Sequence, residues 1–220
     1  MSPSPATLRP DADLKAKALF DAAWKRIETR LGGLGSMQAP RELVLLNGAP
    51  GSGKGTNAAF IERSRGLERT VCISSLLAES SEAHSLMDAG ALVSDSVVLD
   101  CLLGALLDPA RGAEPAGCVV DGFPRSPMQV ELLLQLHDRL TNMHDAFADH
   151  PILAHRWPRP SFRIVMLFVD EALSIRRQLD RGVATAKLRE RALLAGVPEA
   201  GSKNRATDAS EAIARSRYGT

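Results

Sequence analysis

Aromatic residues are scarce in this chain of 220 residues, and it has neither an excess of charge of one sign nor long apolar runs. Aromatics make up only 4% of it, so a nucleic-acid surface built on stacked rings is not expected. The 27 Lys and Arg balance 26 Asp and Glu, so no overall field attracts nucleic acid or an anionic membrane. Any anion must therefore be bound by a local site.

Targeting and metal-binding patterns are also missing. The N-terminal sequence MSPSPATLRPDADLKAK has no apolar segment typical of a secretory signal, and no run approaches the ~20 apolar residues of a membrane span. No two of the three cysteines have the C-x-x-C spacing used in metal or redox chemistry; they are Cys72, Cys101 and Cys118. We expect a cytoplasmic protein with reduced thiols and no nucleic-acid or membrane partner. The oligomeric state stays open, with a monomer favoured.

Short apolar runs alternate with longer helical stretches along the chain. The runs at 42–46, 69–73, 117–120 and 163–169 predict strands, and such runs separated by helices indicate a parallel sheet covered on both faces. We expect an α/β fold with three layers, α/β/α, around a central parallel sheet. Residues 137–161 are expected to finish a helix and then to form a surface excursion.

Residues 1–40 predict an N-terminal helical extension, ahead of a core over 41–220. Its helix is expected to start at Asp11 or Asp13 and to run to about Leu31, where glycines end it. Its apolar positions fall mostly at helical spacing: Leu14, Ala18, Ala22, Trp24, Ile27 and Leu31. This helix carries no chemical motif, so we expect it to pack on the core or on a partner.

The strongest motif lies between the first predicted strand and the next helix. It consists of Gly48, Ala49, Pro50, Gly51, Ser52, Gly53, Lys54, Gly55 and Thr56. Glycines let successive backbone N–H groups turn toward phosphate oxygens, and the N-terminus of the following helix adds positive charge. The lysine brings a mobile ammonium to the outer phosphates. The pattern indicates a phosphate-binding loop and a fold of the P-loop NTP hydrolase type.

A second motif, Asp-Gly-Phe-Pro-Arg-x-x-x-Gln, follows the third predicted strand. Asp121 at the strand end can hold Mg²⁺ through water. Arg125 presents a planar fork that binds a phosphate with two hydrogen bonds. Gln129 offers a donor and an acceptor on one amide, which matches the edge of adenine.

Together these motifs resemble the adenylate kinases and related nucleoside monophosphate kinases, in which the loop reads G-x-P-G-x-G-K-G-T. The resemblance covers roughly residues 42–218, with gaps. It implies reversible, Mg²⁺-dependent transfer of a phosphoryl group from ATP to AMP, giving two ADP. It also implies a monophosphate-binding segment at 74–100 and a lid at 182–204, in which residues 186–196 are expected to form a small helix.

The resemblance assigns roles residue by residue. ATP is expected to contact Gly48, Pro50, Gly51, Ser52, Gly53, Lys54, Gly55, Thr56 and Arg177, and Mg²⁺ to lie near Thr56 and Asp121. AMP is expected to contact Ser75, Leu92, Val93, Gly122, Arg125 and Gln129. The residues expected to act in catalysis are Lys54, Arg125, Arg177, Arg181, Arg205 and Arg217, with Arg215 an alternative to Arg217.

Two departures from the family pattern keep other functions open. After Ser75 the chain reads Leu-Leu-Ala-Glu where the family usually has Gly-Asp-x-Leu-Arg, whose arginine grips the monophosphate. The family also normally has a final strand and helix after the position of residue 218, so we expect either that this chain is truncated or that a partner completes the fold. The alternatives are a kinase for another nucleoside monophosphate or a small metabolite, and a non-catalytic nucleotide-binding module.

Overall fold

A four-stranded sheet lies at the centre of the computed structural model, which describes residues 10–79, 83, 93–111, 116–194, 211 and 215. Its strands are β1 (Glu42–Gly48), β2 (Arg69–Cys72), β3 (Cys118–Asp121) and β4 (Ser161–Leu167). They lie in the order β2-β3-β1-β4, and β3 pairs in parallel with both β1 and β2. The predicted α/β fold with a central parallel sheet is confirmed.

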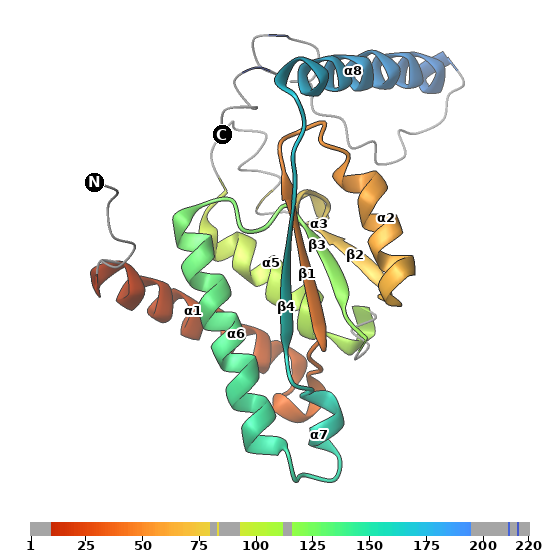
Figure 1. Ribbon diagram of the computed structural model, residues 1–220. Coiled ribbons are helices and arrows are strands. Elements are labelled where there is room, and N and C mark those ends of the chain that lie inside the picture. The colour runs from red at the N-terminus through yellow and green to blue at the C-terminus, as the bar shows by residue number, and fades with distance from the viewer. Residues whose placement is uncertain are drawn as a thin grey trace, which may run out of the picture. The chain divides into compact units, whose positions relative to one another are not determined.

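Helices cover both faces of this sheet (Figure 1). The helices are α1 (Pro10–Leu31), α2 (Lys54–Arg65), α3 (Ile73–Glu79), α5 (Asp95–Leu107), α6 (Pro127–Phe147), α7 (Leu153–Arg156) and α8 (Glu171–Leu194). Short 3₁₀ turns occupy Leu34–Ser36 and Pro109–Arg111. In Figure 1, α5 and α6 lie on one face with α1 against them, and α2 lies on the other, which gives the three layers expected.

The chain divides into two compact units. Unit 1 comprises Met1–Leu46 and Ala58–Val165 and holds most of the sheet with its helices. Unit 2 comprises Asn47–Asn57 and Met166–Thr220 and holds the glycine-rich loop together with α8.

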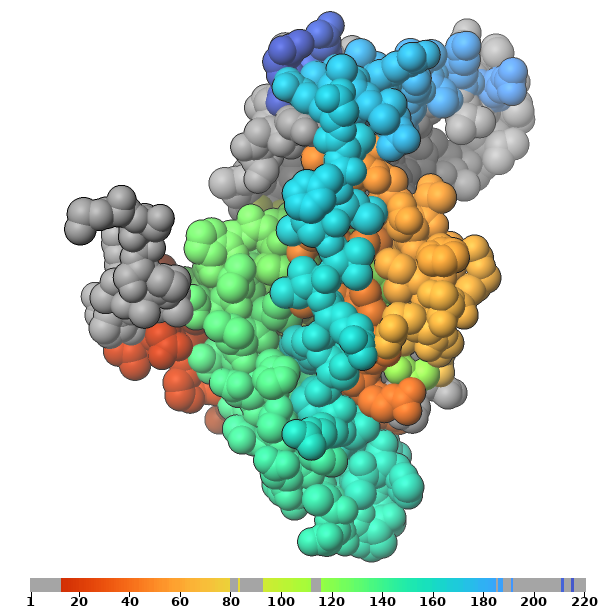
Figure 2. Space-filling view, in the orientation of Figure 1, coloured from red at the N-terminus to blue at the C-terminus, as the bar shows by residue number. Residues whose placement is uncertain are grey.

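The four strands differ in how far they are covered. Residues 42–46 of β1 are all buried, as the continuous apolar run predicts for an inner strand. In β4, by contrast, the apolar side chain of Ile164 is 68% exposed, because this strand lies at the sheet edge. Figure 2 shows the β4 segment uncovered on the viewed face, between α6 and α2. Coverage of both faces therefore holds for the inner strands only.

The N-terminal helix is part of the core of unit 1. Its buried side chains are Ala16, Phe20, Ala23, Trp24 and Ile27, and it packs against α5 and α6. Not all of the apolar positions at helical spacing are buried, since Leu14, Ala18 and Ala22 are exposed. The bulky rings decide the orientation of the helix, since burying Phe20 and Trp24 removes far more apolar surface from water than burying alanines does.

The segment after α6 was expected to be a surface excursion, and this is wrong for Trp157. Its side chain is fully buried and lies 6.1 Å from the ring of Trp24 and 6.4 Å from that of Phe147, measured between ring centroids. The short helix α7 leads into it, and its carbonyl accepts a hydrogen bond from His144 Nδ1 at 3.0 Å. The two tryptophans of the chain thus join α1 to the segment before β4.

In unit 2, α8 continues through most of the segment expected to form a lid. The small helix expected at 186–196 is not separate, because α8 runs without a break to Leu194. Its sequence is rich in Ala, Leu, Arg and Glu, which favour helix, and Gly182 alone costs about 1 kcal/mol relative to alanine. Whether this part of the chain closes over a substrate stays a prediction.

A buried carboxylate ties three elements of unit 1 together. Glu42 at the start of β1 accepts hydrogen bonds from Arg65 at the end of α2 and Arg163 on β4, both 2.7 Å long. Burial raises the pKa of Glu42, but the hydrogen bonds and charges of the two arginines outweigh it and hold that pKa below its ordinary value.

This arrangement predicts a pH dependence of stability. A carboxyl with a lowered pKa in the folded state stabilises the fold above about pH 4.5, its ordinary pKa, and the effect is lost as the pH falls through the folded-state value. We expect Glu42→Gln to lower the free energy of unfolding at pH 7 by on the order of 1–2 kcal/mol. Urea unfolding should show a smaller loss between pH 7 and pH 4 for this variant than for wild type. Equal losses in both would contradict the prediction.

Candidate functional site

The glycine-rich loop of unit 2 turns at glycines whose backbone has positive φ. Gly48, Gly51 and Gly53 have φ values of 147°, 79° and 89°, a region that other residues rarely adopt. At Gly51 there is also no room for a side chain, because a Cβ atom would lie 2.8 Å from the carbonyl oxygen of Ser174. The sequence-predicted loop is therefore built around positions that only glycine suits.

Lys54, the first residue of α2, turns back across this loop. Its Nζ donates to the carbonyl oxygens of Gly48 at 2.6 Å and Ala49 at 3.1 Å. An ammonium held among loop carbonyls is placed to exchange those contacts for phosphate oxygens. The hydroxyl of Ser52 is buried and has no hydrogen-bond partner within the described part of the chain, so it too can meet an anion.

One face of α8 supports the same loop. Ser174 Oγ donates to the carbonyl of Pro50 at 2.5 Å, and Arg177 Nη1 donates to that of Gly51 at 2.9 Å. One turn on, Gln178 Nε2 reaches Ser174 Oγ at 3.3 Å, and both polar side chains are fully buried. Residues 174, 177, 178 and 181 are spaced as neighbours on one helix face.

Sequence reasoning found the two arginines of this face and missed Ser174 and Gln178. The available signal was their spacing, because polar residues at i and i+4 share the face that carries Arg177 and Arg181. Of the arginines expected to act in catalysis, Arg177 contacts the loop backbone, and Arg181 lies one turn further on in α8. Arg215 forms ion pairs with Glu171 at 3.7 Å and Glu211 at 3.3 Å.

In unit 1, a residue expected to hold Mg²⁺ and one expected to bind the acceptor lie near the ends of β3 and β2. Asp121 is the last residue of β3 and lies level with Leu46 on β1 and Cys72 on β2. Its Oδ1 atom is buried without a hydrogen-bond partner in the described ranges. The half-buried Ser75 follows directly after β2, in α3. The carboxyl ends of parallel strands are where α/β sheets bind ligands.

Arg125 lies directly over Gly122. Gly122 has φ 91°, and a side chain there would come within 3.1 Å of Arg125 Cζ. The missing side chain thus leaves room for the guanidinium beside the end of β3. Arg125 itself is exposed, so its planar fork is open to an anionic ligand.

Gln129 is held in place at both ends of its amide. The side chain is 7% exposed. Its Oε1 accepts from the backbone N–H of Arg125 at 2.7 Å, and its Nε2 donates to Asp95 Oδ1 at 2.8 Å. Ser126 caps α6 by accepting from the backbone N–H of Gln129 at 3.1 Å. The residue expected to read the base is therefore part of an ordered polar network.

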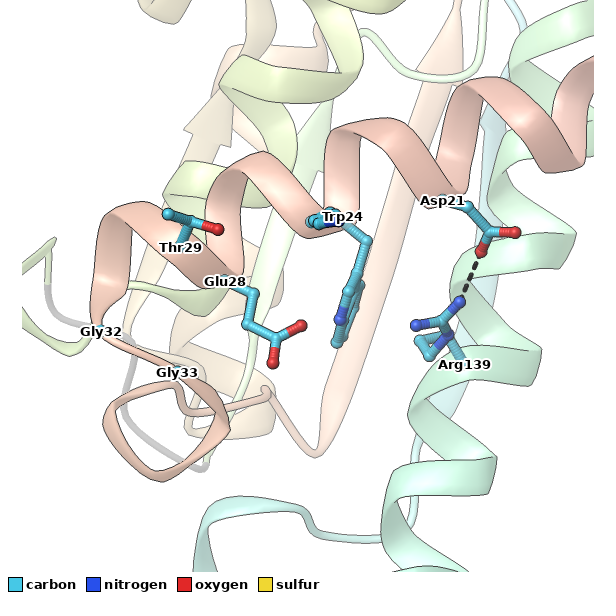
Figure 3. Close-up of a pocket in the computed structure, with 8 residues that line it drawn as sticks. Asp21, Trp24, Glu28, Thr29, Gly32, Gly33 and Arg139 are labelled. Atoms are coloured by element: carbon cyan, nitrogen blue, oxygen red, sulfur yellow. Dashed lines mark hydrogen bonds and ion pairs between the residues drawn. The ribbon is translucent and has the colours of Figure 1, made fainter.

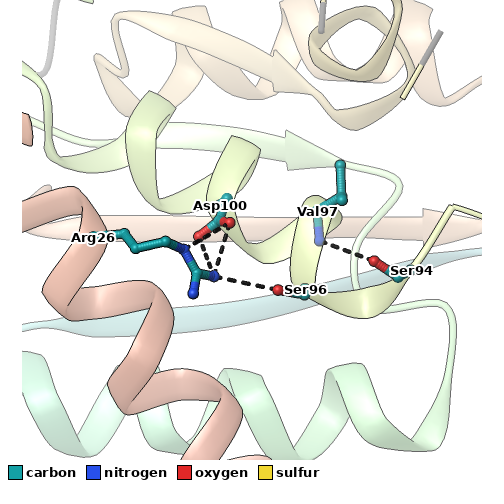
Figure 4. Close-up of polar contacts among 5 residues, drawn as sticks. All are labelled: Arg26, Ser94, Ser96, Val97 and Asp100. Atoms are coloured by element: carbon teal, nitrogen blue, oxygen red, sulfur yellow. Dashed lines mark hydrogen bonds and ion pairs between the residues drawn. The ribbon is translucent and has the colours of Figure 1, made fainter. Parts of the chain in front are cut away.

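The first two turns of α5 are fixed by further polar contacts (Figure 4). Ser94 caps the helix by accepting from the backbone N–H of Val97 at 3.4 Å. From α1, Arg26 binds both carboxylate oxygens of Asp100, at 2.8 and 2.9 Å, and the hydroxyl of Ser96 at 3.2 Å. The N-terminal helix therefore holds the same helix that carries Asp95.

Some predicted site residues cannot be placed. Leu92, Arg205 and Arg217 lie outside the described residues, as do 195–204 of the expected lid. Val93 is described and packs partly buried against the core of unit 1, while Thr56 is exposed in the first turn of α2. The roles given to all these residues stay predictions.

A surface groove of about 640 Å³ lies beside α1 in unit 1 (Figure 3). It is lined by Asp21, Trp24, Lys25, Glu28, Thr29, Gly32, Gly33 and Arg139. The guanidinium of Arg139 is already bound to Asp21 at 2.5 Å and stacks 5.1 Å from the Trp24 ring centroid. None of the motif residues lines this groove, so it lies apart from the predicted chemistry.

The described residues contain no group of three or more His, Cys, Asp or Glu side chains that could hold a metal ion. A Mg²⁺ ion held by one carboxylate and water needs no such group. None of the described helices is long and apolar enough to cross a membrane.

Comparison with known proteins identifies adenylate kinases that are similar to this chain. No protein-family model matches the chain. It is similar to an adenylate kinase of Synechococcus sp. strain CC9311, with 36% identity over 149 residues, 64% of this chain and 70% of that protein. An adenylate kinase of Parasynechococcus marenigrum is 32% identical over 146 residues, 63% of this chain and 68% of the relative. One from Gloeobacter violaceus is 41% identical over 102 residues, 43% of this chain and 44% of the relative.

Proposed function

Because the chain belongs to the adenylate kinase family of nucleoside monophosphate kinases, we propose that it transfers a phosphoryl group reversibly from ATP to AMP, giving two ADP. The observation that carries this proposal is the loop backbone around Lys54, with three glycines at positive φ and the ammonium turned back over it. Such a loop binds the phosphates of a nucleoside triphosphate.

In this proposal, unit 2 binds the donor. Lys54 contacts the outer phosphates of ATP, and the backbone N–H groups of the loop surround them. Ser174 and Arg177 hold the carbonyls of Pro50 and Gly51, which fixes the loop before the nucleotide arrives. A preorganised loop supplies its stabilisation without the cost of reordering during the reaction.

Unit 1 binds the acceptor. Arg125 pairs with the phosphate of AMP through its fork, and the Gln129 amide contacts the adenine edge. The attacking group is a phosphate oxygen of AMP, which is already ionised at neutral pH, so no side chain has to remove a proton. The new bond joins this oxygen to the γ-phosphorus, and the bond between that phosphorus and the bridging oxygen of ATP breaks.

The residues present fit a magnesium ion. The buried Oδ1 of Asp121, without a partner in the described residues, offers a carboxylate acceptor for a hydrated cation, and the exposed Thr56 hydroxyl is a second candidate. The ion, when bound, neutralises charge on the phosphates of ATP. The arginines, with Lys54, neutralise the remaining charge that develops on the transferring group.

Comparing acceptors tests the proposal against its alternatives. With ATP and Mg²⁺ present, we expect ADP formation with AMP and at least tenfold lower kcat/KM with CMP, UMP or GMP. Preference for one of the other monophosphates would support the alternative kinase. That alternative is considered because the chain lacks the family's phosphate-binding arginine after Ser75. ATP binding without turnover of any acceptor would support a non-catalytic nucleotide-binding module.

Support of the loop by α8 gives a further prediction. Ser174→Ala removes a buried hydrogen bond worth about 1 kcal/mol, so we expect the KM for ATP to rise roughly fivefold with a small change in kcat. Arg176→Ala, on the exposed side of the same helix, is the matched control and should leave KM unchanged. Equal KM values for Ser174→Ala and wild type would show that this contact does not support ATP binding.

A further inference from the structure

Asp95 at the start of α5 accepts hydrogen bonds from two residues of the second motif. Its Oδ1 receives Gln129 Nε2 at 2.8 Å and Ser126 Oγ at 3.3 Å. Gln129 lies 34 positions away in sequence and is almost fully buried. The contact therefore joins α5, the helix that ends the expected monophosphate-binding segment, to the residue expected to read the base.

This contact defines which way the amide of Gln129 points. An ionised carboxylate only accepts hydrogen bonds, so the NH₂ end of the amide must face Asp95. The carbonyl end then faces the backbone N–H of Arg125, which only donates. Both partners require the same orientation, and a reversed amide would leave a buried donor facing a donor and an acceptor facing an acceptor.

An amide in this orientation still has groups to offer. A primary amide has two N–H donors and two acceptor lone pairs, and the contacts to Asp95 and Arg125 use one of each. The remaining donor and acceptor match the edge of adenine, which shows an acceptor beside a donor. The corresponding edge of cytosine shows the same two groups on a smaller ring, so discrimination depends on how rigidly the amide is held.

We propose that Asp95 is a specificity-determining positioning residue, which fixes the Gln129 amide so that the acceptor site selects adenine over other bases. The proposal rests on the proposed function and deepens it. Asp95 acts through Gln129 and not by touching the nucleotide. The same carboxylate aligns Ser126, the cap of α6, so the start of α6 and the amide are set together.

A purely structural role for Asp95 makes different predictions. As an acidic residue in the first turn of α5, it also interacts favourably with the helix dipole. If that were its whole role, replacing it would lower stability and affect all acceptors alike. If it positions Gln129, replacement raises the KM for AMP with little change in kcat and reduces the preference for AMP over CMP.

A double-mutant cycle separates these roles. We expect Asp95→Ala to lower the ratio of kcat/KM for AMP to that for CMP about tenfold, and Gln129→Ala to lower it at least as far. In the Gln129→Ala background, Asp95→Ala should have no further effect on the ratio, because its target is gone. Asp95→Asn should restore most of the preference, since its carbonyl can still accept from Gln129. Additive effects, or an unchanged ratio in Asp95→Ala, would overturn the proposal.

Two controls separate a loss of acceptor preference from a loss of stability. Asp100→Ala removes another carboxylate from the same helix, one that pairs with Arg26, and should lower stability without changing the AMP-to-CMP ratio. If Asp95→Ala does not fold, Asp95→Ser replaces it, because serine suits the first turn of a helix and its shorter side chain does not reach the amide. The same loss of preference is then expected, and its absence would overturn the proposal.

Failure of the proposed function gives a distinct result. In that case the wild type forms no ADP with AMP, and the cycle is measured on binding of AMP and CMP by calorimetry. A tenfold loss of binding preference in Asp95→Ala would still support the positioning role, and an unchanged preference would overturn it. Turnover of AMP by wild type together with an unchanged ratio in the variants would overturn the positioning role alone.

Discussion

Replacing Lys54 with methionine is expected to lower kcat by about 10³-fold or more while the protein stays folded. The ammonium donates to the carbonyls of Gly48 and Ala49, and from this position it can move to contact the phosphates of ATP. A single cation that stabilises the charge of a transferring phosphoryl group changes such rates by roughly 10³–10⁵-fold. Methionine keeps most of the length and apolar stem of the side chain and loses the charge.

The measurement is steady-state ADP formation from ATP, AMP and Mg²⁺, with urea unfolding as the check on folding. Lys17→Met is the matched control, because this exposed lysine on α1 pairs only at the surface with Asp21. It should keep both activity and stability. A kcat for Lys54→Met within a fewfold of wild type would mean that the loop does not take part in catalysis.

The second large effect is expected at Arg125. Arg125→Ala should lower kcat/KM for AMP by about 10³-fold, because a phosphate group loses a bidentate, charged partner. Arg125→Lys should recover only part of the loss, since an ammonium keeps the charge but not the planar fork. The side chain is exposed and packs over Gly122, so stability should change by no more than about 0.5 kcal/mol.

Initial rates over a range of AMP concentrations, with ATP saturating, measure this effect. Arg63→Ala, an exposed arginine near the end of α2, serves as the control and should behave as wild type. Full activity in Arg125→Lys would show that charge alone is needed at this position. Full activity in Arg125→Ala would remove Arg125 from the acceptor site.

Local patterns were enough to predict the fold and the position of the glycine-rich turn after the first strand. Each strand was predicted from a short continuous apolar run between helical stretches, which is typical of a buried strand. The loop was predicted because its glycines and Lys54 follow one another directly in sequence. The backbone of Gly51, with φ 79° and a neighbour that excludes a side chain, gives the physical reason for the pattern. Features fixed by neighbouring residues are visible in sequence.

Features fixed by distant contacts were missed. The burial of Trp157 depends on Trp24, which lies more than a hundred positions earlier, and the buried face of α1 depends on which large rings the rest of unit 1 accepts. Ser174 looks like an ordinary polar residue of a surface helix until the carbonyl of Pro50 is placed beside it. Likewise, nothing in the spacing of Asp95 and Gln129 indicates that they share a hydrogen bond.

The fate of the γ-phosphoryl group of ATP is the most direct test of the proposed reaction. The protein is incubated with Mg²⁺, AMP and ATP labelled in the γ-phosphate, and the products are separated. We predict that ATP and AMP disappear in equal amounts and that the label is found in the β-phosphate of ADP. Label released as inorganic phosphate, or retained in ATP while the protein binds it, would contradict phosphoryl transfer to AMP.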